Sequence, residues 1–156
     1  EDFANEFLNK TLTFAIELKV LGIEKETLEI INKYSKNRDN IYITSLLYEA
    51  LENVRKIDKT IKLSYIVNKI SDENIEDLLK IKGNQICPKA NDITKEDIIK
   101  ANNYNIGVRL WGIDSEETMK NVYKLETEGM TVNFPDKLIK LKENNDKLES
   151  FNDDVI

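Results

Sequence analysis

The sequence contains no histidine, and this absence restricts its chemistry more than any other feature of the 156 residues. It excludes Ser-His-Asp and Cys-His catalytic arrangements and every metal site that needs an imidazole, and it removes the commonest general acid or base near neutral pH. The single cysteine, Cys87, allows no internal disulfide and gives no sign of a zinc cluster. Any chemistry of this chain alone therefore has to use carboxylates, lysines or a metal ion held by oxygen.

Basic charge and long apolar runs are also scarce. Acidic residues outnumber basic ones by 29 to 23, and the net charge of −6 argues against nucleic acid as a partner. No apolar run approaches the roughly 18 residues that a membrane span needs, and the N-terminus lacks the basic and apolar parts of a signal peptide. With 40% hydrophobic and 33% charged residues, the composition is typical of a single globular domain.

What the sequence does contain is a regular alternation. Short β-branched or aromatic runs alternate with longer amphipathic stretches, which is typical of βα units. The strands are expected at residues 12–19, 41–46, 62–67, 84–88, 106–111 and 130–134. Most of these runs are largely apolar, which predicts a parallel sheet buried on both faces.

The stretches between the expected strands carry helix-start signals. Thr94 begins a capping-box pattern, and Pro135 stands where a first-turn proline is favoured. Helices are expected to begin at or next to Glu24, Tyr48, Ser71, Thr94, Asp114 or Ser115, and Pro135. Six βα units are therefore expected within residues 1–143, followed by a polar C-terminal tail at residues 144–156.

Repeated βα units form either an open doubly wound sheet or a closed eight-stranded barrel. With only five glycines, the sequence has no Gly-x-Gly-x-x-Gly phosphate loop, and this disfavours the doubly wound sheet. We therefore expect an α/β protein with a (β/α) TIM-type barrel that is incomplete here, with about six of its eight βα units. Because six strands are too few to close such a barrel, we expect a missing segment before Glu1.

In barrels the functional residues lie at the carboxyl ends of the strands. At the end of the first expected strand, Glu17 and Lys19 fall on the same side because side chains alternate along a strand. If that side faces the barrel, Glu17 is a candidate cation ligand and Lys19 a candidate phosphate contact. A simple Glu–Lys pair on an edge strand explains the same pattern, and the two residues alone leave both interpretations open.

Three further positions follow strand ends. Trp111, the only tryptophan, either lines a substrate pocket or fills the core. Arg109 lies two residues before Trp111 and therefore on the same side of the strand; it either reaches a phosphate or points outward toward an acidic helix residue. We expect Cys87 to be a buried small side chain and Lys89 to be an exposed lysine at a strand end.

Taken in order, six segments resemble the strand motifs of the glycerophosphodiester phosphodiesterase family. They are residues 14–19, 43–46, 62–67, 86–88, 108–114 and 129–135. The first is similar to the family's Asn-Ile-Glu-Leu-Lys strand. The residues around Ser45 and Tyr48 are similar to those found in the membrane-anchored branch of the family. The resemblance covers about residues 12–142. Each segment is a weak signal by itself, but six in the correct order at compatible spacing are a strong joint signal.

The resemblance implies a barrel of the phosphatidylinositol-phospholipase-like kind that hydrolyses small-molecule glycerophosphodiesters to glycerol 3-phosphate and an alcohol. It implies that Glu17 is a ligand of a divalent cation, Ca²⁺ or Mg²⁺, that Lys19 contacts the phosphate, and that Trp111 lines the substrate pocket. A hard cation held by carboxylate suits this reaction because it polarises a phosphoryl oxygen.

The departures from the family are as informative as the matches. The family's His-Arg and Glu-x-Asp motifs and its second histidine precede the segment that begins at Phe14, and they have no counterpart here. Asn133 replaces the family's usual Asp, and Gly112 replaces its Thr. We therefore expect no catalytic residue in this chain, which would be an inactive C-terminal portion of the enzyme.

The alternative is a non-catalytic degenerate barrel that acts as a binding or structural module with a partner. In either case the open sheet edges need cover, which a missing N-terminal barrel segment or self-association would supply.

Overall fold

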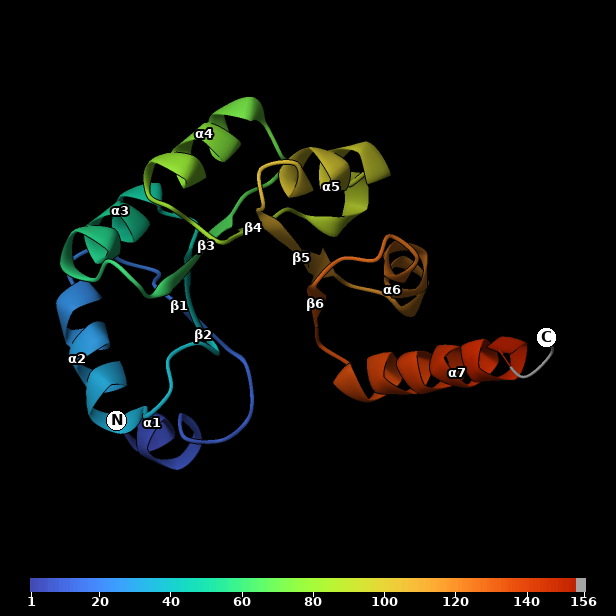
Figure 1. Cartoon of the computed structure of the whole chain (residues 1–156), viewed down its shortest axis with the longest axis horizontal. Coiled ribbons are helices and arrows are strands. Elements are labelled where there is room, and N and C mark those ends of the chain that lie inside the picture. The colour runs from blue at the N-terminus through green and yellow to red at the C-terminus, as the bar shows by residue number, and fades with distance from the viewer. Residues whose placement is uncertain (154–156) are drawn as a thin grey trace.

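Six parallel strands form a single curled sheet in the order β1 to β6 (Figure 1). The computed structural model describes the backbone of residues 1–153 and the side chains of residues 1–145. The strands are β1 (Phe14–Glu17), β2 (Ile41–Ser45), β3 (Lys62–Ile66), β4 (Gln85–Cys87), β5 (Gly107–Ile113) and β6 (Gly129–Val132). The sequential order excludes a doubly wound sheet, in which the strand order reverses, and it confirms an incomplete TIM-type barrel.

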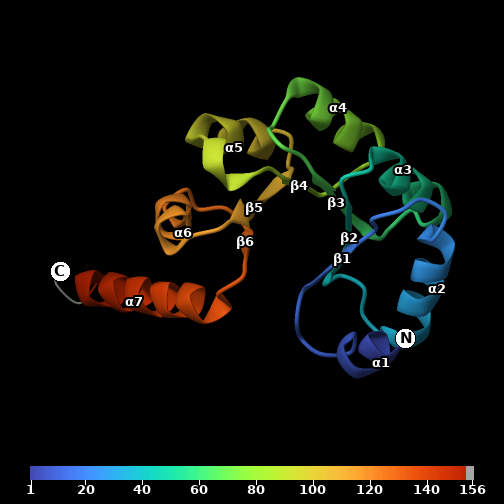
Figure 2. The same cartoon turned by 180° about the vertical axis from the view of Figure 1, so that it is seen from behind.

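A helix follows every strand, so the described chain contains the six expected βα units. The helices are α1 (Asp2–Phe7), α2 (Glu24–Tyr34), α3 (Tyr48–Ile57), α4 (Asp72–Lys80), α5 (Lys95–Asn102), α6 (Glu116–Tyr123) and α7 (Pro135–Asp153), and a short 3-10 turn, η1 (Ala90–Asp92), precedes α5. Seen from either side, helices α2 to α6 form an arc around the convex side of the sheet (Figure 2). No helix of the described residues is long and apolar enough to cross a membrane.

The hydrophobic core lies between the convex face of the sheet and this arc of helices. On β2, Ile41 and Ile43 are fully buried, and on β5 Leu110 is fully buried. Helix residues at helical spacing, such as Leu51 and Val54 of α3, pack against them without any exposed surface. Burial of this apolar face supplies the main driving force for the curled sheet.

The concave face of the sheet carries polar side chains. Thr44, Ser64 and Gln85 are neighbours in the strand register and point to this face. All three are at most 5% exposed, so the polar layer is packed and not merely solvated. In the sequence these residues alternate with the apolar ones of the core, as expected for strands with two different faces.

Local signals placed most helix starts correctly. Helices α2 and α3 begin at the expected residues, and the capping box of Thr94 is present in full. Helix α1 was not predicted; its Phe3 and Phe7 rings stack at 5.0 Å and Phe3 also meets Phe14 of β1.

The expected C-terminal tail begins inside a helix. Because α7 runs from Pro135 to Asp153, residues 144–153 continue the helix of the sixth unit. The domain boundary at residue 143 stays a prediction, and the last part of the expected tail, residues 154–156, lies outside the described residues.

Candidate functional site

The carboxyl ends of the parallel strands meet at one edge of the curled sheet, and this edge carries the sequence-predicted site residues. Glu17 closes β1, and Lys19 follows it by two residues. Trp111 lies in the last part of β5, and Lys89 follows β4 beside it, where the two residues form an isolated parallel bridge. The fold therefore gathers at one rim residues that are up to 94 positions apart in the sequence.

Glu17 and Lys19 form an ion pair at this rim. Glu17 Oε2 lies 3.8 Å from Lys19 Nζ, and the two side chains are 33% and 77% exposed. Glu17 pairs in register with Thr44, whose side chain faces the concave side, so the Glu17 carboxylate is directed to that side as well. The distance between the charged atoms is long for an ion pair and both side chains are in contact with solvent, so both charged groups are accessible to a ligand.

Backbone contacts of the rim fix Trp111 in place. Its indole Nε1 donates a hydrogen bond of 2.9 Å to the carbonyl of Val67, at the end of β3, and its backbone N–H donates to Pro88 O at 3.2 Å. Gly112 follows with a φ of +72°, inside the part of β5 where the register with β6 shifts. Trp111 is only partly buried, so its ring is available as a wall at the rim and is not simply core filling.

Arg109 does not point outward toward an acidic helix residue, and its contact with a phosphate stays a prediction. Arg109 faces the concave side, where Nε donates to Gln85 Oε1 at 3.1 Å and Nη1 donates to Thr131 Oγ1 at 2.6 Å. It forms no ion pair with an acidic helix residue among the described side chains, and it stands nearer the amino ends of the strands than the rim of Trp111. Alternation along β5 correctly predicts that Arg109 and Trp111 lie on the same side of the strand, but it does not predict the partners of Arg109, which come from β4 and β6.

Arg109 belongs to a polar network inside the sheet that the sequence analysis missed. Gln85 Nε2 donates to Glu128 Oε2 at 2.7 Å, and Ser64 Oγ donates to Gln85 Oε1 at 2.9 Å. Cys87 is fully buried, as expected, with its Sγ 2.9 Å from Ser64 Oγ; burial raises the pKa of its thiol. The only sequence signal for this network was the alternation of polar with apolar residues along each strand.

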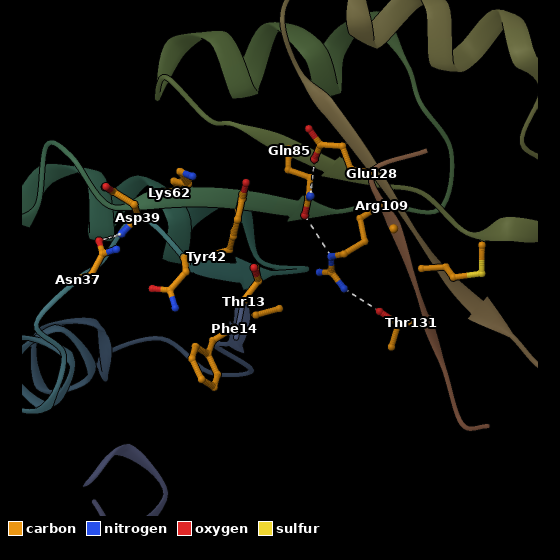
Figure 3. A pocket seen from close by; sticks show the side chains of 14 residues that line it. Thr13, Phe14, Asn37, Asp39, Tyr42, Lys62, Gln85, Arg109, Glu128 and Thr131 are labelled. Atoms are coloured by element: carbon orange, nitrogen blue, oxygen red, sulfur yellow. Dashed lines mark hydrogen bonds between the residues drawn. The ribbon is translucent and has the colours of Figure 1, made fainter. Parts of the chain in front are cut away.

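A cavity of about 640 Å³ opens beside this network (Figure 3). Its walls come from the amino-terminal parts of β1 to β6 and the residues just before them, and include Tyr42, Lys62, Gln85, Arg109 and Glu128. It therefore lies at the amino ends of the strands, at the opposite end of the sheet from Glu17 and Trp111. In a barrel this end contributes to stability, while reactions take place at the carboxyl ends.

The described residues do not fit a complete metal centre. No group of three or more His, Cys, Asp or Glu side chains in the described part of the chain is placed to hold a metal ion. Glu17 is a single carboxylate with an ammonium group 3.8 Å away, whereas Ca²⁺ or Mg²⁺ takes six or more oxygen ligands. Any cation at this rim would need most of its ligands from outside these residues.

Comparison with known proteins agrees with the architecture. The sequence matches the glycerophosphoryl diester phosphodiesterase family over residues 2–137. A search of curated proteins gives no match.

Three solved structures share the fold. A protein assigned as a glycerophosphodiester phosphodiesterase from Galdieria sulphuraria superposes with a TM-score of 0.74 at 22% identity, covering 83% of this chain and 57% of its own. A phosphodiesterase from Oleispira antarctica, solved in complex with the product sn-glycerol-3-phosphate, gives 0.74 at 18% identity, with coverages of 84% and 55%. A glycerophosphodiester phosphodiesterase from Parabacteroides distasonis gives 0.69 at 11% identity, with coverages of 87% and 59%.

The chain thus spans less than two thirds of each of these proteins, which agrees with a sheet that is curled but not closed. The sequence match over residues 2–137 covers most of the chain. The chain belongs to the glycerophosphoryl diester phosphodiesterase family.

Proposed function

We propose that this chain forms the C-terminal portion of a glycerophosphodiester phosphodiesterase barrel, which hydrolyses glycerophosphodiesters to glycerol 3-phosphate and an alcohol. The observation that carries the proposal is the rim at the carboxyl ends of the strands, where Glu17, Lys19 and Trp111 gather on a family half-barrel. A relative of the same fold holds sn-glycerol-3-phosphate, which is the product that such a reaction releases.

Each of the three residues has a role that its chemistry supports. The Lys19 ammonium group, 77% exposed, neutralises charge on the substrate phosphate. The Trp111 ring, held by the Val67 carbonyl, forms an apolar wall against which the substrate is oriented. Glu17 supplies one carboxylate toward a divalent cation, Ca²⁺ or Mg²⁺, whose remaining ligands come from elsewhere in the barrel.

This chain alone supplies no general acid or base for the reaction. With no histidine in the sequence and no group of three or more possible metal ligands among the described residues, we expect the isolated chain to be inactive. The absence of histidine equally supports the second candidate, a non-catalytic barrel that binds the same phosphodiesters or a partner without hydrolysing them.

Turnover separates the two candidates. The protein as it occurs in its source organism is incubated with glycerophosphodiesters and a divalent cation, with and without a chelator, and released glycerol 3-phosphate is measured with a coupled dehydrogenase. Chelator-sensitive release supports the enzyme. Absence of release, together with binding of the phosphodiester, supports the binding module.

The Glu17→Ala variant of that protein tests the rim. We expect turnover to fall by about two orders of magnitude or more, because the cation loses a ligand. Folding should be largely unchanged, since the Glu17 side chain is 33% exposed and, among the described side chains, it pairs only with Lys19, at 3.8 Å. The matched control is Glu49→Ala, which removes an exposed carboxylate in the first turn of α3. Wild-type turnover in Glu17→Ala would refute the assignment of Glu17.

A further inference from the structure

A free ammonium group stands beside the Trp111 ring. Lys89 Nζ lies 6.0 Å from the ring centroid, within the range of a cation–π contact. Unlike Lys19, Lys89 has no carboxylate within ion-pair distance among the described side chains. No carboxylate of the described residues is paired directly with this ammonium group, so its charge acts on whatever approaches the ring.

Lys89 is exposed, as expected, but its side chain lies along the backbone of β5. A Cβ added to Gly112 would lie 3.1 Å from Lys89 Cγ and 3.3 Å from its Cε, so the methylene stem packs along the Gly112 backbone. The Lys89 backbone N–H donates to Asn68 O at 3.2 Å, in the bend that follows β3. The isolated bridge between Lys89 and Trp111 places the ammonium group and the ring on neighbouring segments.

A polar cavity of about 200 Å³ adjoins the same lysine. Its polar lining combines the Asn68 amide and the Asp97 carboxylate with the ion pair of Lys69 and Asp92, whose charged atoms are 3.6 Å apart. The lining therefore offers hydrogen-bond donors and acceptors close together. Hydroxyl groups both donate and accept, so this surface suits a ligand rich in hydroxyls.

We propose that Lys89 sets the head-group specificity of this rim, in favour of glycerophosphodiesters with an uncharged polyol head group and against those with a cationic one. An aromatic face is the natural site for a quaternary ammonium group. Here a lysine already occupies that position, and a second cation meets like-charge repulsion. The inference rests on the proposed function, since it concerns the substrate of the same site.

Binding can be followed without turnover because Trp111 is the only tryptophan and its fluorescence reports ligands at the rim. The 156-residue chain is titrated separately with glycerophosphoglycerol and with glycerophosphocholine. We expect the first to bind at least about fivefold more tightly, as a cation–π site filled by a like charge implies.

Three variants sharpen the test. Lys89→Met keeps the apolar stem of the side chain but removes its charge. We expect this variant to bind glycerophosphocholine about threefold to tenfold more tightly than the wild type, and to bind glycerophosphoglycerol with equal or lower affinity. Lys89→Arg retains the charge and should retain the wild-type preference. Lys25→Ala, which removes an 80% exposed lysine on α2, is the control and should change neither affinity.

Each outcome decides the inference. Equal affinities in the wild type, or the same change for both ligands in Lys89→Met, would overturn the role of Lys89 and leave the proposed function intact. Absence of binding to either ligand would overturn the inference as well. The expected preference without turnover in the source protein would support the inference and refute hydrolysis, so the two failures are distinguishable.

Discussion

At the scale of single residues, Asp58 organises the turn between α3 and β3. Its Oδ1 accepts hydrogen bonds from the backbone N–H groups of Thr60 and Ile61, both at 2.9 Å, and Oδ2 lies 2.6 Å from Arg38 Nη2. Burial by itself raises the pKa of the Asp58 carboxyl, but the hydrogen bonds from Thr60, Ile61 and Arg38 outweigh it and hold the pKa at about 2.

Asp58→Asn should lower the free energy of unfolding by about 2 kcal/mol at pH 7, which corresponds to the difference between the ordinary pKa and the depressed one. Because the folded-state pKa lies below the unfolded-state value, this stabilisation is complete above about pH 4 and is lost as the pH falls toward 2. Urea unfolding of wild type and variant from pH 7 to pH 2.5 measures it.

The control for Asp58→Asn is Glu29→Gln, which removes a 66% exposed carboxylate and should have little effect. A stability difference between wild type and Asp58→Asn that is independent of pH would contradict the role given to the charge.

Thr44 shows how a polar side chain buried on the concave face can lower the stability of the fold. Its hydroxyl is buried and has no hydrogen-bond partner among the described residues. Thr44→Val removes that unsatisfied group with little change of shape, and we expect the isolated chain to gain about 1 kcal/mol in thermal or urea unfolding. Ser64→Ala is the matched control: its hydroxyl donates to Gln85, so its removal should cost about 1 kcal/mol. Destabilisation by Thr44→Val would mean that the hydroxyl does find a partner.

At the scale of elements, β5 changes its register at Gly112. The φ of Gly112 is +72°, a conformation in which residues with a Cβ are strained. The register between β5 and β6 shifts at this point. The irregular segment carries the Trp111 ring and the packing surface for Lys89. The bend in β5 is therefore part of how the rim is built.

Gly112→Ala should lower the free energy of unfolding by about 1–2 kcal/mol and shift the emission of Trp111, because the new Cβ is strained and meets the Lys89 stem. Gly129→Ala is the matched control on the adjacent β6. The nearest atom to its added Cβ is 4.0 Å away and its φ is not positive, so the effect should stay within about 0.5 kcal/mol. Equal effects of the two variants would show that the bend at Gly112 is not needed.

At the scale of the whole molecule, the sheet has two open edges, β1 and β6. The N–H groups of Phe14 and Leu18 bond to β2, so that of Ala15 between them points away from the sheet. Such unpaired backbone groups on an edge favour pairing with another strand. We propose that a further barrel segment or a second copy of the chain covers these edges.

Self-association of the isolated chain should depend on the β1 edge. In analytical ultracentrifugation at tens of micromolar, we expect species larger than one chain, and we expect Ala15→Pro to reduce them because proline removes the outward N–H. Ala15→Val keeps that donor and should associate as the wild type does. A strictly monomeric wild-type chain would show that these edges do not pair.

Particular elements show which parts of the fold and of the site could be predicted from the sequence. The starts of α2 and α3 and the capping box at Thr94 were predictable because spacing and capping act within a few residues. The contacts of Arg109 were not, since Gln85 and Thr131 stand on separate strands 24 and 22 residues away. Similarly, no local pattern shows that the Trp111 indole reaches Val67, 44 residues earlier.

The sequence by itself thus determined six βα units and the resemblance to a phosphodiesterase family, because apolar periodicity and motif order are written along the chain. Only the tertiary structure decided which side chains share a face and which end of the sheet they occupy. Pairing register, curvature and the bend at Gly112 arise from contacts between distant segments, and these separate the rim of Glu17, Lys89 and Trp111 from the polar network around Arg109.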